Sequence, residues 1–308
     1  MIYMSGPKSY TPVLTAEQIA RLEKDAEERR KEAEFQRILR EFREHRNDKE
    51  YQEKLQYELA NIEASERDKI MSSISTFISQ NVSFDFSKYA GERILTAEEV
   101  AKQKYLQYKE ALGKYSSICE IMEVPMADCF GYDETRSDEL IQQIIAETKR
   151  LESLQVERMK NKLIYDTSLM VLEEMGYKLI GNNIITKKSG VSVNSTLFRI
   201  DENTAVNLTC TSNGQYTFEL VGVNEDGHAP SESEISKLLQ LMNTQCHADF
   251  QVIREKLAKK GIVMCDTVER PPDKNYCRSK NIRNYCTVIA EEENYAVEQK
   301  GQIANGQI

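Results

Sequence analysis

Hydrophobic residues recur at helical spacing over the first half of the chain. From Thr15 to about Gln80 there is neither Gly nor Pro, and the later stretches are bounded by turn residues. This pattern predicts helices over about 15–80, 96–124 and 138–175. The segment "REHRNDKEY" is the place where we expect a break in the first of them.

The lengths of these helices predict how they pair. Helices 96–124 and 138–175 are long enough to cover the second half of the first helix, which predicts an antiparallel coiled-coil, three-helix bundle. The first half of helix 15–80 is then left without a partner inside the chain. We therefore expect its apolar stripe, Phe35, Leu39 and Phe42, to bind a partner protein or a second copy.

After Gly176 the hydrophobic period changes from that of a helix to that of a strand. The pair Asn213-Gly214 between two alternating runs is a strong hairpin signal. Alternation predicts one buried and one solvated face for an antiparallel meander. The residues expected on its buried face are Val206, Leu208, Cys210, Tyr216, Phe218 and Leu220.

One more helix follows the meander. Ser231 and Glu234 fit a capping box, and the helix is expected to end at Gly261, before a last strand in "IVMCDTV". Its apolar stripe should lie on the buried face of the sheet. That stripe comprises Ile235, Leu239, Met242, Cys246, Phe250, Ile253 and Leu257.

The expected fold class is therefore α+β, a long helical coiled coil followed by a small domain of β-meander packed on one helix. The expected division is an extended segment at 1–14, a helical region at 15–175, an α+β domain at 176–270 and a polar, disordered tail at 271–308. Pro7 and Pro12 favour irregular structure in the first segment.

The composition limits the partners and the cellular compartment that we expect. The chain has 308 residues, 30% of them charged, and a net charge of -9, which does not favour binding to polyanions by its overall field. No apolar run approaches the ~20 residues of a membrane span, and the N-terminus lacks a secretory pattern. Seven cysteines at irregular spacing indicate a reduced, cytoplasmic setting.

Candidate chemistry is sparse. Cys246 and His247 are adjacent, and Cys265, Cys277 and Cys286 lie too far apart for the usual zinc-ligand spacing. There is no phosphate-binding glycine motif and no nucleophile elbow. We therefore expect no metal, no cofactor and no catalytic residue. A pair between Cys265 and a histidine leaves open an enzyme with a cryptic site in the C-terminal domain.

One region is basic in this acidic protein. Between residues 254 and 283 there are nine Lys or Arg and four Asp or Glu, with tyrosines among them. Such a stretch can bind phosphates and stack bases, so nucleic acid is an alternative partner. The residues expected to bind it are Lys256, Lys259, Lys260, Arg270, Lys274, Arg278 and Lys280.

The order of a charged coiled coil, "LEEMGY", a meander and the helix "CHADFQVIREKLAKKGI" resembles bacterial coiled-coil proteins. Some of these are encoded in multi-gene systems of the conflict or defence type, and the resemblance implies a subunit of such a system. The reading we favour is a non-enzymatic scaffold or adaptor that assembles with itself or a protein partner through the N-terminal helix.

Overall fold

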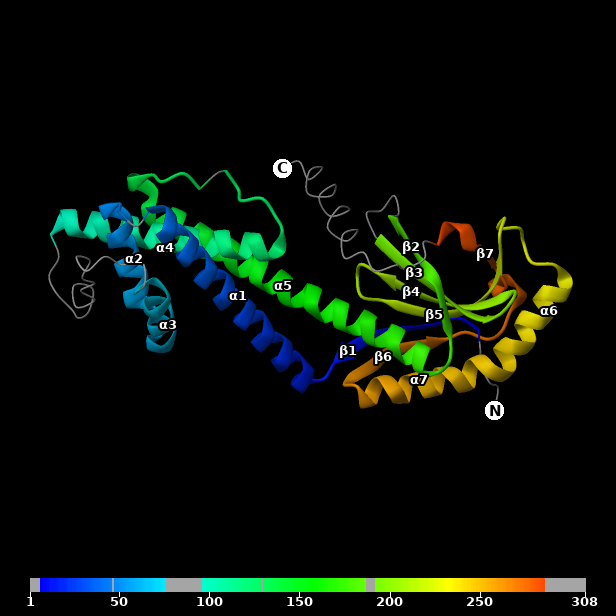
Figure 1. Cartoon of the computed structure of the whole chain (residues 1–308). Coiled ribbons are helices and arrows are strands. Elements are labelled where there is room, and N and C mark those ends of the chain that lie inside the picture. The colour runs from blue at the N-terminus through cyan, green and yellow to red at the C-terminus, as the bar shows by residue number, and fades with distance from the viewer. Residues whose placement is uncertain (1–5, 46, 76–95, 129, 187–191, 286–308) are drawn as a thin grey trace. The chain divides into compact units, whose positions relative to one another are not determined.

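The computed structural model describes residues 6–45, 47–75, 96–128, 130–186 and 192–285. It confirms the α+β class, with helices and one antiparallel sheet (Figure 1). The chain divides into two compact units. Within the described residues, the sheet unit comprises 6–22 and 158–285, and the helical unit comprises 23–157.

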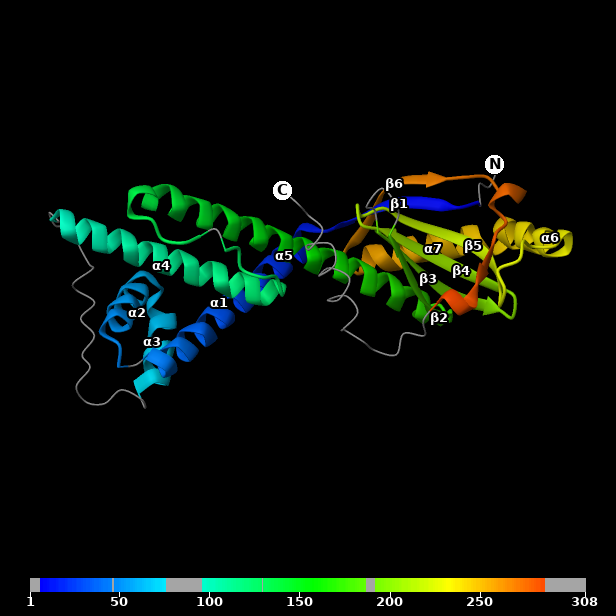
Figure 2. The same ribbon diagram turned by 90° about the horizontal axis from the view of Figure 1, so that it is seen from above.

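The helical unit is built around two helical pairings. Helix α1 pairs with two shorter helices, and α4 pairs with the first part of α5 (Figure 2). The boundary between the units falls within α1 and α5. The helix bounds are α1 (Ala16–His45), α2 (Lys49–Asn61), α3 (Ala64–Ser75), α4 (Ala97–Met122) and α5 (Ser137–Glu174).

The expected helix over 15–80 is not continuous in the structure. Helix α1 ends at His45, within "REHRNDKEY", and Asp48 caps α2 by accepting a hydrogen bond from the backbone N–H of Glu50. A second break separates α2 from α3 at Ile62. Residues 76–80 lie outside the described residues.

These breaks overturn the expectation that the stripe of α1 lacks a partner inside the chain. Helices α2 and α3 fold back on α1, and Phe42 is 3% exposed. Phe35 and Leu39 are half-buried and pack against the same apolar cluster. The stripe is therefore part of the interior of the helical unit. The cluster's buried members are Ile38, Phe42, Tyr51, Leu55, Leu59, Ile70 and Ile74.

The sheet unit contains an antiparallel sheet in the order β2-β3-β4-β5-β1-β6, with β7 parallel to β5. The hairpin predicted at Asn213-Gly214 joins β4 to β5, and Gly214 has a positive φ of 78°. The strand bounds are β1 (Lys8–Leu14), β2 (Lys178–Thr186), β3 (Ser192–Asp201), β4 (Thr204–Thr211), β5 (Tyr216–Asn224), β6 (Ile262–Glu269) and β7 (Ser279–Asn281).

Two helices, α6 (Glu232–Leu241) and α7 (His247–Lys259), run along one face of the sheet (Figures 1 and 2). The predicted single helix is divided by a π-helical turn at Met242–Cys246. Its capping box at Ser231 and Glu234 is present. Phe250, Ile253 and Leu257 are buried against the inner face of the sheet, as the stripe predicts.

The two ends of the chain are placed differently from the expectation. Lys8–Leu14 is not a loose terminus, because β1 lies between β5 and β6 in the sheet. Residues 271–285 do not belong to a disordered tail: they form two short 3-10 helices and β7. Residues 1–5 and 286–308 lie outside the described residues.

Pro12 explains why β1 is hard to recognise. A proline lacks the N–H that a central strand must donate to its neighbours. Strand β5 pairs with β1 only at Lys8, Ser9 and Tyr10, whereas β6 pairs along to Leu14. Pro12 therefore lies where β1 has a neighbour on one side alone, and the proline costs no hydrogen bond to β5.

Candidate interaction surface

The face of the sheet opposite α6 and α7 divides into a covered and an open part. Side chains of Ile282 and Tyr285 lie over one end, where they pack with Leu197, Ala205 and Val221. The remaining part, on β4, β5, β1 and β6, is termed here the open outer face. It comprises Thr209, Thr217, Ser9, Thr11, Val13, Val263, Cys265 and Val268.

The strand register places these side chains in cross-strand rows. Thr209 lies opposite Thr217, Thr217 opposite Ser9, and Ser9 opposite Val268. Further along, Thr11 lies opposite Cys265 and Val13 opposite Val263. Direct partners in an antiparallel pair project from the same face. The open outer face is thus a continuous surface of small, mostly β-branched side chains.

None of the side chains that define this face carries a charge, although 30% of the chain's residues are charged. Val13 is 45% exposed, Val263 46% and Val268 53%. They are three of the nine large hydrophobic side chains that are exposed among the described residues. The hydroxyls of Ser9 and Thr217 share a hydrogen bond of 3.2 Å. The face combines exposed aliphatic groups with hydroxyls.

A buried polar network separates the open part from the covered part. The Ser195 hydroxyl donates to Asn207 Oδ1 at 2.7 Å and shares a hydrogen bond of 2.9 Å with the Tyr285 hydroxyl. Asn207 Nδ2 donates to Glu219 Oε1 at 2.7 Å. Burial raises the pKa of Tyr285. Neither neighbour of Ser195 in this network is a base near neutral pH, so the network positions Tyr285 on the sheet rather than activating the serine.

Strand β6 is an edge of the sheet within the described residues. The register between β1 and β6 shifts between Ser9 and Thr11, and opposite this shift Asp266 has a positive φ of 48°. This is a β-bulge, which twists an edge and disfavours pairing with a further strand. The face of β6 is therefore a better contact surface than its edge.

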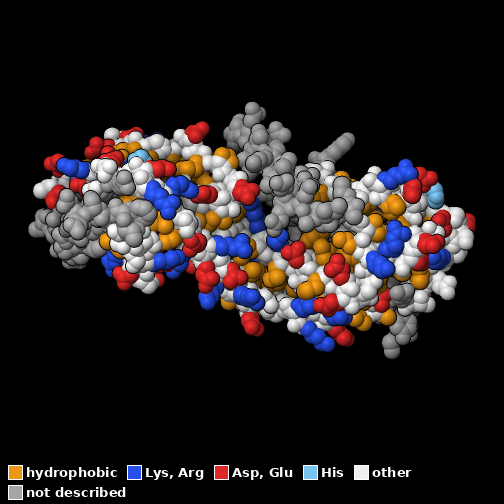
Figure 3. All heavy atoms as spheres, viewed as in Figure 1, with side chains coloured by type: hydrophobic (Ala, Val, Ile, Leu, Met, Phe, Trp, Pro, Cys, Tyr) orange, Lys and Arg blue, Asp and Glu red, His pale blue; other side chains and the backbone are white. Residues whose placement is uncertain are grey.

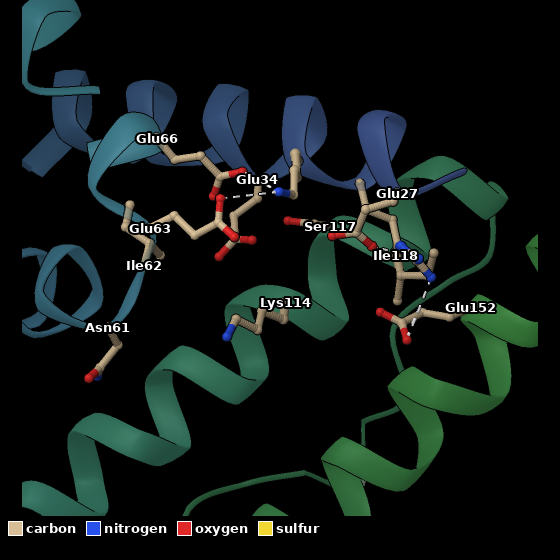
Figure 4. A pocket seen from close by; sticks show the side chains of 12 residues that line it. Glu27, Glu34, Asn61, Ile62, Glu63, Glu66, Lys114, Ser117, Ile118 and Glu152 are labelled. Atoms are coloured by element: carbon tan, nitrogen blue, oxygen red, sulfur yellow. Dashed lines mark hydrogen bonds and ion pairs between the residues drawn. The ribbon is translucent and has the colours of Figure 1, made fainter. Parts of the chain in front are cut away.

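A hollow of about 360 Å³ lies in the helical unit (Figure 4). In Figure 4 the carboxylates of Glu34, Glu63 and Glu66 turn toward the same space. It is lined by residues of α1, the α2–α3 junction, α4 and α5. These residues are Glu27, Arg30, Lys31, Glu34, Asn61, Ile62, Glu63, Glu66, Lys114, Ser117, Ile118 and Glu152.

The charges around this hollow are mostly paired with one another. Arg30 contacts Glu27 at 2.7 Å, Lys31 contacts Glu66 at 2.8 Å, and Lys114 contacts a neighbour on its own helix, Glu110, at 2.8 Å. Glu34 has a longer ion pair with Arg37, at 3.9 Å, and burial raises its pKa. The ion pairs within the chain thus explain the charged lining without a ligand.

The structure separates the residues expected to bind nucleic acid. Lys256 and Lys260 pair with Glu174 at 3.2 and 2.9 Å, beside exposed Lys259. Arg270 follows the other end of the eight-residue strand β6, on the order of 25 Å away. Its guanidinium lies over the Tyr276 ring. Three further residues of the expected set follow Arg270 in the chain. Lys274 begins a short 3-10 helix, Arg278 precedes β7, and Lys280 lies in β7.

The basic stretch is therefore not one surface. Two groups of cations lie at opposite ends of β6, and two members of the first group are already paired with a carboxylate. On the face shown in Figure 3, basic and acidic side chains are interspersed. A phosphate-binding track needs unpaired cations at close spacing, and this placement does not favour nucleic acid as the partner.

The cysteines give no metal site in the part of the chain that is described. No group of three or more His, Cys, Asp or Glu within those residues could hold a metal ion. Cys277 is buried, which raises its pKa, and Cys265 is half-buried on the open outer face. The side chains of Cys246 and His247, and all of Cys286, lie outside the described residues.

The open outer face was missed by sequence reasoning because three of its eight residues belong to β1. The sequence signal was present: in "KSYTPVL" the residues at alternate positions, Ser9, Thr11 and Val13, all lack charge. Val263 and Cys265 alternate in the same way within the predicted last strand. Which strand becomes the neighbour of another is a long-range property that alternation alone does not contain.

Within the described residues, no helix has the length and apolar character that a membrane crossing requires. No protein-family model, no curated protein and no solved structure matches the chain.

Proposed function

We propose that the chain is a non-enzymatic scaffold or adaptor that assembles with a protein partner or with itself through the open outer face. The observation that carries the proposal is the absence of charge from this face in a protein that is otherwise densely charged. This surface replaces the stripe of α1, which is used inside the helical unit. Membership of a bacterial multi-gene system, implied by the resemblance described above, stays a prediction.

The physical reason lies in the cost of removing water. Burying an unpaired charge in an interface costs several kcal/mol, whereas a methyl group gains free energy when it leaves water. The centres of protein interfaces are accordingly depleted in charged residues. Val13, Val263 and Val268 can be desolvated without such a cost. The hydroxyls of Ser9, Thr11 and Thr217 can exchange water for hydrogen bonds with a partner.

The proposal can be tested by photo-crosslinking in cells that express the full chain. A photoreactive amino acid is placed at Thr11, in the centre of the open outer face. The matched control places it at Ser236, which is exposed on α6 on the other side of the sheet. We expect a discrete protein adduct from position 11 and none from position 236. No adduct from position 11, or equal adducts from both positions, would contradict the proposal.

A further inference from the structure

We infer that the partner of the open outer face is a second copy of this chain, bound face to face about a two-fold axis. This inference rests on the proposed use of that face and adds the identity of the partner. It follows from the charge of the molecule, the chemistry of the side chains and the bulge in β6.

Charge restricts which surfaces of two copies can meet. Each chain carries a net charge of -9, so two copies repel one another over most of their surfaces. Like charges placed opposite one another across an interface cost several kcal/mol. A face without charged side chains avoids this repulsion. A strongly charged partner would not bind this face well, because its own charges would lose water without finding a counter-ion.

The side chains are also complementary to themselves. A two-fold axis places each surface patch against the same patch of the partner. A carboxylate only accepts and an ammonium only donates, so neither pairs with its own copy. A hydroxyl both donates and accepts, so Ser9, Thr11 and Thr217 can form hydrogen bonds with the hydroxyls of the same patch on a second chain. Val13 and Val263 can pack against the aliphatic side chains of the same patch on the second chain.

The fold directs the contact to the face rather than the edge. The bulge at Asp266 disfavours strand-to-strand pairing along β6. Two sheets can instead stack about 10 Å apart, with their side chains interdigitating. Tyr285 covers one end of the sheet, so the contact is confined to the part around β1 and β6. A contact confined to part of one sheet face belongs to the small, transient class of interfaces, and we expect a dissociation constant on the order of 10–100 µM.

Sedimentation velocity of the full chain from about 1 to 200 µM tests the inference. We expect the average mass of the wild type to rise toward that of a dimer. Val263→Glu and Val263→Lys should both remain monomeric, because either change would bury two like charges in one small contact without a counter-ion. The control Val252→Glu, at a residue 41% exposed on α7, should dimerise like the wild type. Far-UV circular dichroism shows whether each variant is folded.

Cys265 offers a second, site-specific measurement, since it lies between Val263 and Thr11 on the contact face. Its rate of alkylation, followed by peptide mass spectrometry, should fall several-fold as the chain concentration passes through the dimerisation range. A folded wild type that stays monomeric at 200 µM would overturn the inference. Protection of Cys265 that is independent of concentration would also overturn it, because the chain itself would then cover the face. Either result leaves the crosslinking test of the proposed function to be decided separately.

Discussion

Among the described residues each unit buries one cation, Lys8 or Arg37, and the two cations are held differently. In the sheet unit Lys8 is fully buried, but its partner Glu269, at 2.7 Å, keeps 23% of its side chain exposed. In the helical unit Arg37 is 2% exposed, and one of its partners, Glu58, is 3% exposed. Lys8 is thus paired with a carboxylate that reaches water. Arg37 also has such a partner in Glu41, which is 26% exposed, but its ion pair with Glu58 is buried on both sides.

The difference follows from the sequences of the two interiors. Strands β1, β4 and β5 alternate cleanly, so their inner residues form one large apolar cluster with Phe250 of α7. Lys8 enters this cluster at its border, with its ammonium 5.0 Å from the centre of the Phe250 ring. Helix α1 has few apolar residues. Its unit therefore completes its interior with charges, and Arg37 also contacts Glu41 at 2.9 Å.

Arg37→Met should have the largest effect. Removing Arg37 leaves Glu58 with a longer ion pair to Lys54, at 3.8 Å, and breaking a buried ion pair costs about 3–5 kcal/mol. The double variant Arg37→Met/Glu58→Leu removes both charges and should regain most of this loss. The free energy of unfolding from urea titration at pH 7 measures both. If Arg37→Met alone stays within about 1 kcal/mol of the wild type, Glu58 does not depend on Arg37 and is compensated by Lys54, by water or by taking up a proton.

Gly113→Ala should come next. Gly113 of α4 lies against the end of Arg37, and a Cβ at this position would lie 2.7 Å from the guanidinium carbon. Overpacking of this kind typically costs about 1–3 kcal/mol. The guanidinium is held by its carboxylates, so it has little room to move. Combining Gly113→Ala with Arg37→Met should add much less than the sum of the two, because the clash disappears with the arginine. Full additivity would argue against the contact.

Lys8→Met should cost about 1 kcal/mol or less. Methionine has a similar length and apolar body, and volume-conserving replacements in a core are tolerated best. Glu269 is left without this partner but keeps contact with water. Urea titration under the conditions used for Arg37→Met makes the comparison direct. If Lys8→Met proves as costly as Arg37→Met, solvent access of the partner is not what distinguishes the two cations.

The contrast between the units also explains what the sequence could reveal. Alternation placed Val206 and Leu208 on the inner face correctly, because a strand with one buried face records that face residue by residue. The hairpin at Asn213-Gly214 was also predicted correctly, because its signal lies in the turn residues themselves. The capping box predicted at Ser231 and Glu234 is present in the structure for the same reason.

The predictions that failed concern contacts between residues that lie far apart in the sequence. A stripe such as Phe35, Leu39 and Phe42 shows which side of a helix is apolar, but not whether its partner comes from the same chain. Because α1 ends at His45, α2 and α3 can fold back on it, and they supply that partner. Strand β1 was missed because Pro12 argues against a central strand when only local sequence is considered. The buried pair of Arg37 and Glu58 is also invisible in a helix rich in charges, where most charged residues face water.

The smallest expected effect is a difference in pH dependence between the units. In the helical unit burial raises the pKa of Glu34 above its ordinary 4.5. The folded state then binds the proton more tightly than the unfolded state, so this group stabilises less as the pH rises above about 4.5. In the sheet unit hydrogen bonds from Lys260 and Lys256 lower the pKa of Glu174. Its contribution is complete above about 4.5 and is lost as the pH falls through the lowered pKa.

Two matched variants, Glu34→Gln and Glu174→Gln, separate the contributions of the two glutamates to the pH dependence of stability. From pH 4.5 to 7 the stability of the wild type relative to Glu34→Gln should decrease, while that relative to Glu174→Gln should stay constant. Below pH 4.5 the advantage of the wild type over Glu174→Gln should shrink. Urea titrations at half-unit pH intervals provide both curves. If the wild type instead gains on Glu34→Gln between pH 4.5 and 7, Glu34 is stabilised by its cations more than it is penalised by burial. The charged form of Glu34 would then be stabilised in the folded state, as that of Glu174 is in the sheet unit.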